Sequence, residues 1–291
     1  MSILAATLLA TAVLRPSGWG GTERVPALAR VVVLGASLSQ GYGLERDAGA
    51  PVHMADVVEA SLRAEHEPVR RQTALLFFTD PLPIGRSQVE KAAAADPTLV
   101  VGIDFLFWYG YGSFATEAGR MAMLENGLAL LETFRCPVIV GDFPDVADAS
   151  RDTARGGGQQ KLLAPEQVPP PESLKQLNER LRSWAGEHKS VVVVPVADLV
   201  ARLHSGKDVE IRGNHWSGAA LAGLIQRDRL HPTLEGEVAL WLGSLDAFVR
   251  SRPDLPDSAF DWDAGAIAKR IRESRAKPVA PAKDAPAKGR G

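Results

Sequence analysis

The sequence contains a single cysteine, Cys136, among 291 residues. One thiol cannot form an intramolecular disulfide, and it cannot supply a four-cysteine zinc site. Cys136 stands before Pro137 and an apolar run, so we expect it to act as a small buried hydrophobic side chain. Folds held together by disulfides or by cysteine-bound zinc are therefore excluded.

An excess of charge of either sign is also lacking. The formal net charge is -2 at pH 7, with 33 Lys and Arg against 35 Asp and Glu. A nucleic-acid-binding domain is usually clearly basic, so we expect no nucleic-acid partner. Hydrophobic residues make up 45% of the chain and charged residues 23%, which is ordinary for a globular protein with a substantial core.

No apolar run is long enough to span a bilayer comfortably. The nearest candidate is 3–14 (ILAATLLATAVL), with no Lys or Arg before it and no Ala-x-Ala site after it. Its length is that of a signal-peptide core, so we interpret 1–25 as an export signal or membrane-proximal anchor, which implies a periplasmic or extracellular protein. An N-terminal helix or a misassigned start is the alternative, and it implies a cytoplasmic one.

Several motifs of known enzyme chemistry are missing. The chain has no Gly-x-Ser-x-Gly elbow, which disfavours the α/β-hydrolase superfamily. It also has no phosphate-binding glycine loop with Lys, no His-Glu-x-x-His and no dinucleotide fingerprint. Nothing in the sequence therefore points to a nucleotide or to a zinc-peptidase site.

What the sequence does contain is an alternation of apolar runs and helical stripes. The runs are apolar throughout, as in strands buried on both faces of a parallel sheet. They cover 30–34, 74–78, 99–103, 138–140 and 191–194. Apolar residues at helical spacing lie between or after them, over 54–63, 121–131, 174–184 and 234–248. This alternation predicts a three-layer α/β fold in one domain over 26–255.

Two segments break the alternation. Residues 148–170 contain three consecutive glycines and several prolines, which predicts a long flexible excursion. Residues 270–291 end in a mixture of Ala, Pro, Lys and Gly, which cannot bury a core and predicts a disordered tail.

The first chemically informative segment is Gly35-Ala36-Ser37-Leu38-Ser39, directly after the first predicted strand. A serine there lies at the carboxyl edge of the sheet, where ligands of open α/β folds bind. The glycine allows the chain to turn sharply. A plain strand-to-helix turn with a serine N-cap would give the same pattern, so this segment alone leaves both interpretations open.

The second segment is Asp228-Arg229-Leu230-His231-Pro232, just before the last predicted helix. A serine hydroxyl is a poor nucleophile unless a base lies within hydrogen-bonding reach, and imidazole has a suitable pKa. A carboxylate three residues before the histidine can accept the Nδ1 proton and leave Nε2 free to face the serine.

The two segments together resemble the SGNH/GDSL hydrolase family. That family opens with Gly-Asp-Ser-Leu-Ser after its first strand and closes with Asp-x-x-His-Pro before its last helix. The resemblance covers about residues 30–250 and implies a flavodoxin-like three-layer sandwich with a five-stranded parallel sheet. It also implies that Ser37 is the nucleophile, His231 the general base and acid, and Asp228 its orienting partner. Ala36 replaces the family's Asp, which is not itself a catalytic group.

The two middle blocks of the family are degenerate here. The third block, Gly-x-Asn-Asp, should follow the third strand, but the chain has Ile103 at the place of Asn and then Asp104. An isoleucine cannot donate to an oxyanion, and an ionised Asp104 would repel one. For the glycine of the second block we find only Gly85. Loss of one oxyanion donor typically costs about 10²–10³-fold in turnover.

An aromatic segment, 105–112 (FLFWYGYG), follows the third predicted strand and should line the same edge as Ser37. Trp108 and Tyr109 could supply donors and an apolar wall for an acyl group or a sugar, while a hydrophobic core plug is the alternative. Asp142 and Asp145, after the fourth strand, could bind a metal or a polar substrate. Closing a turn or capping a helix is the commoner role of such residues, and we favour it.

The leading hypothesis is hydrolysis of a small-molecule or carbohydrate ester through an acyl-serine, with no metal or organic cofactor. The missing Asn motivates a second hypothesis, a non-catalytic ligand-binding protein with the same fold. A water-excluding aromatic wall would favour a third, transfer of the acyl group to a carbohydrate hydroxyl. The sequence carries no prediction of oligomeric state.

Overall fold

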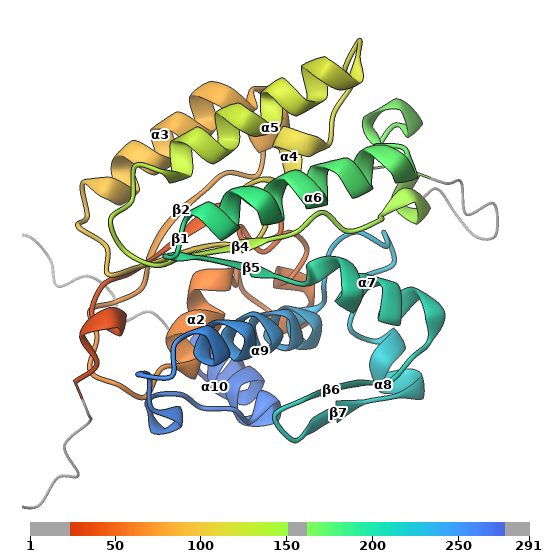
Figure 1. Ribbon diagram of the computed structural model, residues 1–291. Coiled ribbons are helices and arrows are strands. Elements are labelled where there is room, and N and C mark those ends of the chain that lie inside the picture. The colour runs from red at the N-terminus through yellow and green to blue at the C-terminus, as the bar shows by residue number, and fades with distance from the viewer. Residues whose placement is uncertain (1–23, 151–161, 277–291) are drawn as a thin grey trace, which may run out of the picture.

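The computed structural model describes residues 24–150 and 162–276, and a five-stranded parallel sheet lies at its centre (Figure 1). The strands are β1 (Val31–Gly35), β2 (Arg70–Thr73), β3 (Leu99–Gly102), β4 (Val138–Gly141) and β5 (Val191–Val194). Their spatial order is β2-β1-β3-β4-β5, and every neighbouring pair is parallel. This is the strand order of flavodoxin-like sheets, so the predicted fold class is confirmed.

Helices cover both faces of the sheet, which gives three layers (Figure 1). On one face lie α3 (Pro81–Ala93), α5 (Glu117–Leu131) and α6 (Pro171–Glu187). On the other lie α2 (Met54–Ser61), α9 (Leu234–Ser251) and α10 (Ala264–Ala276). Successive residues of β1 enter opposite cores: Val31 and Val33 face α2 and α9, while Val32 and Leu34 face the other layer.

Shorter elements complete the chain. The helices among them are α1 (Glu45–Ala48), α4 (Phe107–Gly110), α7 (Val196–Ser205) and α8 (Gly218–Ala222). The 3₁₀ turns are η1 (Pro26–Leu28), η2 (Phe77–Thr79), η3 (Ala147–Ser150), η4 (Pro165–Gln167) and η5 (Asp257–Ala259). Between α7 and α8 lies an antiparallel hairpin of β6 (Val209–Ile211) and β7 (Asn214–Trp216).

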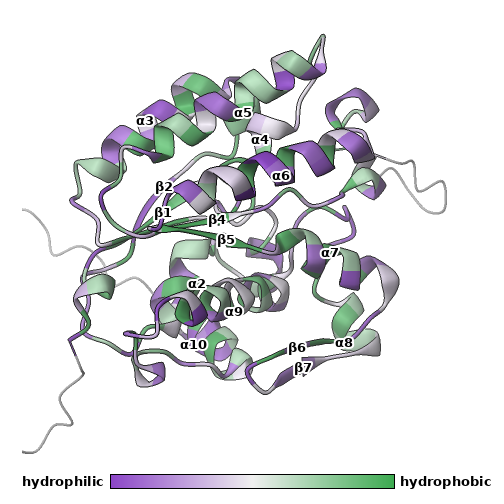
Figure 2. Cartoon of the chain, viewed as in Figure 1, coloured by the Kyte–Doolittle hydropathy of each residue, from purple (hydrophilic) through white to green (hydrophobic). Residues whose placement is uncertain are grey.

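One predicted strand lies at a different place. The second strand is Arg70–Thr73 and not 74–78, because β2 forms the edge of the sheet and its polar residues are exposed or half-buried. Figure 2 shows the contrast between this hydrophilic strand and the apolar β4 and β5. The apolar run 74–78 turns away from the sheet into η2, where only Phe77 is fully buried.

The folded domain also extends beyond its predicted end at 255. Helix α10 packs on α9 and α2 and buries Ile267 and Ile271. Residues 270–276, predicted to be tail, therefore belong to this helix. The remainder of the predicted tail, nearly all of the predicted signal or anchor segment, and 151–161 of the predicted flexible excursion lie outside the described residues.

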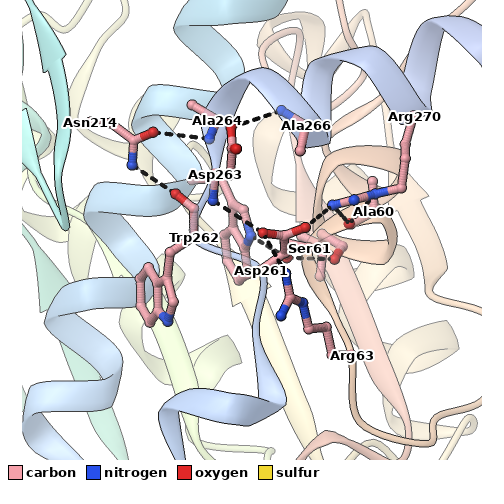
Figure 3. Close-up of polar contacts among 12 residues, drawn as sticks. Ala60, Ser61, Arg63, Asn214, Asp261, Trp262, Asp263, Ala264, Ala266 and Arg270 are labelled. Carbon is pink, nitrogen blue, oxygen red and sulfur yellow. Dashed lines mark hydrogen bonds and ion pairs between the residues drawn. The ribbon is translucent and has the colours of Figure 1, made fainter.

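Side-chain bonds hold this C-terminal part in place (Figure 3). Asp261 is 4% exposed and pairs with Arg63 at 3.0 Å and with Arg270 at 2.5 Å. Asn214 of β7 donates to the Trp262 carbonyl at 2.7 Å and accepts from the Ala264 amide at 3.0 Å. The hairpin and α10 are thus linked to each other and to the body of the domain.

Across the two described ranges, none of the helices is both long enough and apolar enough to cross a membrane.

Candidate active site

Two loops bring a serine and a histidine together at the carboxyl edge of the sheet. His231 Nε2 lies 2.8 Å from Ser37 Oγ, although the residues are 194 positions apart. His231 Nδ1 lies 2.9 Å from Asp228 Oδ2. His231 is 4% exposed, so these interactions occur in a largely desolvated place, where they are stronger than in water.

The Asp228 loop has a local geometry that explains this arrangement. Asp228 Oδ1 accepts from the amides of Leu230 and His231, both at 2.9 Å, as in an Asx turn. Arg229 has a left-handed φ of 58°, which lets the chain reverse direction between the carboxylate and the imidazole. Within this single turn, one oxygen of Asp228 therefore binds backbone amides and the other binds the His231 ring.

Gln226 and Tyr42 join this loop to the Ser37 loop, and sequence reasoning did not identify either. Gln226 Nε2 donates to the Tyr42 carbonyl and to the Pro232 carbonyl, each at 2.7 Å. The Tyr42 ring packs on the His231 ring with centroids 4.4 Å apart. Tyr42 lies five residues after Ser37 and Gln226 two residues before Asp228, so their closeness to the two motifs in sequence was the only available signal.

The protonation of Asp228 follows from its surroundings. Burial acts to raise its pKa, but the hydrogen bond and charge of His231, with the His231 and Leu230 amides, together outweigh burial and lower the pKa. The group is therefore a carboxylate at neutral pH. A carboxylate here accepts the Nδ1 proton and favours the tautomer whose Nε2 can accept from Ser37.

Asp104 supports the Ser37 loop. Its Oδ2 accepts from the amides of Leu38 and Ser39 at 3.0 and 3.2 Å, and its Oδ1 accepts from Ser39 Oγ at 2.5 Å. A Cβ on Gly35, whose φ is +148°, would lie 2.0 Å from Asp104 Oδ1. This carboxylate, which would repel an oxyanion if it were ionised, is thus engaged by the backbone and side chain of the Ser37 loop.

The amide of Ser37 remains available as a donor. The neighbouring amides of Leu38 and Ser39 are bonded to Asp104, whereas the Ser37 N–H donates to no other residue in the described ranges. Ile103, at the place of the family's Asn, is 4% exposed and lines the same pocket as Ser37. Its side chain contributes apolar surface and no hydrogen bond.

A predominantly apolar pocket of about 90 Å³ opens beside Ser37 and His231. Segments after β1, β3 and β4, together with α7, the Asp228 loop and α9, contribute to its walls. Its apolar lining includes Ile103, Phe107, Trp108, Leu199, Leu230 and Leu240. The pocket can therefore hold an apolar group next to the Ser37 hydroxyl.

Of the aromatic residues in segment 105–112, some line the pocket and others fill the hydrophobic core. Trp108 lines the pocket, with 7% of its surface exposed. Tyr109 is fully buried and donates its hydroxyl to the Pro81 carbonyl at 2.9 Å. Gly85 lies in α3 beside that hydroxyl, and a Cβ there would meet it at 2.0 Å. The structure thus places Gly85 and Tyr109 in the core between α3 and α4, away from the pocket lining.

The carboxylates of Asp142 and Asp145 accept hydrogen bonds from backbone amides. Asp142 Oδ1 accepts from the Ala197 amide at 2.7 Å, in the first turn of α7, and Asp142 Oδ2 accepts from Arg182 at 3.2 Å. Asp145 Oδ1 accepts from the Ala147 amide at 2.9 Å and closes a turn. Among the residues described, no three His, Cys, Asp or Glu side chains are grouped so as to hold a metal ion.

No protein-family model matches the sequence. The comparison with curated proteins also gives no match.

Several solved structures are similar in fold at low sequence identity. A gut microbial diltiazem-metabolizing enzyme aligns over 80% of this chain with 12% identity and a TM-score of 0.48, and the chain spans only 48% of that protein. A lipase/acylhydrolase from Enterococcus faecalis aligns over 87% of this chain and 100% of its own, with 16% identity and a TM-score of 0.47. A GDSL-like lipase from Bacteroides thetaiotaomicron aligns over 80% and 93%, with 16% identity and a TM-score of 0.44.

Proposed function

We propose that this protein is a serine hydrolase that cleaves carboxylic esters through an acyl-serine intermediate. The observation that carries the proposal is the pair of hydrogen bonds from Ser37 Oγ to His231 Nε2 at 2.8 Å and from His231 Nδ1 to Asp228 at 2.9 Å. A nucleophile, a base in contact with it and a carboxylate that orients the base are the parts that such catalysis needs.

In the first half of the reaction, Ser37 Oγ attacks the ester carbonyl while His231 Nε2 takes the hydroxyl proton. The carbonyl oxygen becomes negatively charged and accepts a hydrogen bond from the Ser37 N–H. When the tetrahedral intermediate collapses, the bond to the alcohol oxygen breaks and His231 returns the proton to that oxygen. The acyl group is left on Ser37.

In the second half, His231 takes a proton from a water molecule that attacks the acyl-serine. The bond to Ser37 Oγ then breaks, Ser37 regains its proton from His231, and the carboxylic acid leaves. Asp228 stays ionised throughout and stabilises the imidazolium that forms twice in each cycle. The residues require no cofactor for either step.

The lining of the pocket favours an apolar acyl group. Two carboxylates reach it, Asp104 and Asp142, and both are occupied by backbone amides. The side chains left to contact a substrate beside Ser37 are apolar, so transfer of a hydrocarbon chain from water into the pocket is favourable.

A fluorophosphonate probe tests the first step. We expect the wild type to be labelled on one residue, and we expect Ser37→Ala to lose the label while its unfolding temperature stays nearly unchanged. Ser39→Ala serves as the matched control for nucleophile identity, since Ser39 Oγ is engaged with Asp104. Equal labelling of the wild type and Ser37→Ala would contradict the proposal.

Turnover separates hydrolysis from the alternatives. The proposal expects release of free acid from short-chain aryl esters between pH 5 and pH 9. Labelling of Ser37 without any turnover would indicate the ligand-binding protein, and acylated sugar formed at the expense of free acid would indicate transfer to a carbohydrate hydroxyl.

A further inference from the structure

The large apolar side chains that remain exposed are gathered in one short segment. Within the described ranges they are Leu75, Leu76, Phe78 and Leu82, with 43%, 58%, 46% and 37% of their surface accessible. Exposed apolar residues scattered one by one are common on protein surfaces. A contiguous group marks a contact surface, and we call these four residues the apolar patch.

The segment that carries the patch is anchored to the hydrophobic core. Phe77 is fully buried and packs edge-on against Phe105 and Tyr109, with ring centroids 5.7 and 5.9 Å apart. The Tyr109 hydroxyl also donates to the Pro81 carbonyl at 2.9 Å. Because the backbone is held at Phe77 and Pro81, the outward direction of the neighbouring side chains follows from the fold itself.

The patch adjoins the candidate active site. It follows β2, and Ser37 follows the neighbouring strand β1, so both lie at the carboxyl edge of the sheet. The Phe78 ring lies 5.5 Å from the Trp108 ring, and Trp108 lines the pocket that contains Ser37 and His231. Apolar contacts therefore run from the exposed patch to the pocket.

The charges within the segment that carries the patch are balanced. Between residues 75 and 86 the chain carries one acidic residue, Asp80, and one basic residue, Arg86, and both are exposed. A strongly charged partner would be matched by an excess of opposite charge, as when anionic lipid binds a basic cluster. The patch instead fits an apolar partner with a neutral surface.

We propose that the apolar patch docks the protein on a lipid surface with neutral headgroups, so that ester substrates pass from the lipid into the pocket. Exposed Leu and Phe side chains insert at the boundary between headgroups and acyl chains. Esters with apolar acyl groups are concentrated in lipid rather than in water. The delivery of esters rests on the proposed hydrolase function, whereas the docking itself is independent of it.

The single cysteine of the chain allows a direct test of docking. In a Cys136→Ser background, Leu76→Cys carries an environment-sensitive fluorophore, and Glu90→Cys, at an exposed position of α3, is the matched control. Both variants keep the full chain. With phosphatidylcholine vesicles we expect a blue shift and a severalfold gain in emission at position 76 and neither at position 90, with little dependence on salt.

Results of two kinds would overturn docking on lipid. One is an absent response at position 76, or an equal response at both positions. The other is a response at position 76 that needs no vesicles and grows with protein concentration, since a second copy of the chain would then cover the patch.

Activity gives a second test. With an ester taken through its critical micelle concentration, we expect the wild-type rate to rise steeply and the rise to be about tenfold smaller in Leu75→Ser/Leu76→Ser. Both proteins should cleave a dissolved short-chain ester equally and unfold at similar temperatures. A retained rise, or an equal loss on the dissolved ester, would contradict the proposal. If the wild type cleaves no ester, the proposed hydrolysis fails and the vesicle measurement still decides docking.

Discussion

Asp104 connects the Ser37 loop to the sheet, because its carboxylate accepts hydrogen bonds from the amides of Leu38 and Ser39 and from the Ser39 hydroxyl. An amide side chain can still accept from the two backbone amides, whereas a methyl group leaves them without an acceptor. We therefore expect Asp104→Asn to retain most fluorophosphonate labelling. Asp104→Ala should lower the labelling rate about tenfold or more, because without these hydrogen bonds the loop no longer holds the Ser37 hydroxyl in position for attack.

The control for this pair is the unfolding temperature, which shows whether either variant has lost its fold. Equal labelling rates in a folded Asp104→Ala protein would mean that the carboxylate does not position Ser37.

Asp228 fixes the tautomer of His231, and its replacement separates this role from simple packing. Asp228→Asn keeps the shape of the turn but can present an N–H toward Nδ1, which favours the tautomer with its proton on Nε2, facing Ser37. We expect kcat on a soluble ester to fall by about 10³–10⁴-fold, with KM little changed. A KM effect without a kcat effect would assign Asp228 to substrate binding.

Some residues of the site could be predicted from the sequence more readily than others. Asp228 and His231 share one turn, so a short motif reveals their relation. Ser37 stands directly after a buried strand, which sets its place on the sheet edge. The roles of Asp104 and Gln226 depend on partners 66 and 184 positions away, and no local pattern encodes such contacts. Gly85 was the only glycine found for the second block, and the fold places it beside Tyr109.

Among the elements, apolar composition decides which strands a sequence reveals, and the edge strand β5, a run of four valines, was predicted as well as the central strands. β1, β3 and β4 are buried along their whole length, so their composition is uniformly apolar and was predicted within one residue of the observed bounds. β2 lies at the edge and pairs only with β1. Its polar sequence therefore resembles a loop, while the apolar run that follows it belongs to the exposed segment with Leu75 and Leu76.

Helix α10 is an element whose attachment can be tested through Asp261 (Figure 3). Burial acts to raise the pKa of Asp261, but the Asp263 amide together with Arg270 and Arg63 outweighs burial and lowers the pKa. The stabilisation is present above the ordinary value of 3.8 and is lost as pH falls through the lowered pKa. Asp261→Asn should lower the free energy of unfolding by about 1.5–3 kcal/mol at pH 7.

Urea unfolding at pH 7 and at pH 3 measures this effect, and the difference between the two proteins should shrink at the lower pH. Asp263→Asn provides a neighbouring control, because Asp263 Oδ1 accepts only from the first turn of α10 in the described structure. A difference that stays constant down to pH 2 would rule out the ion pairs as its source.

For the whole molecule, buried carboxyl groups set the pH at which the fold is most stable. The lowered pKa values of Asp228 and Asp261 favour the folded state above the acid range. Burial raises the pKa values of Asp104 and Asp142, which has the opposite effect. Glu237 adds most to the second group, because it is fully buried in the first turn of α9 and neither of its oxygens has a hydrogen-bond partner among the described residues.

Burial raises the pKa of Glu237 well above 4.5, and the nearby Asp104 carboxylate raises it further. The folded chain thus keeps a proton that the unfolded chain releases, so the free energy of unfolding falls as pH rises from 4.5 toward the folded-state pKa. The slope from this one group is at most about 1.4 kcal/mol per pH unit. Glu237→Gln should remove that slope and make the protein more stable than the wild type at pH 8, as measured by urea unfolding from pH 4 to pH 9. The control is Glu235→Gln, which should keep the wild-type slope because Glu235 is in the same turn but exposed and paired with Arg272. An unchanged slope in Glu237→Gln would show that Glu237 is not the group that loses the proton.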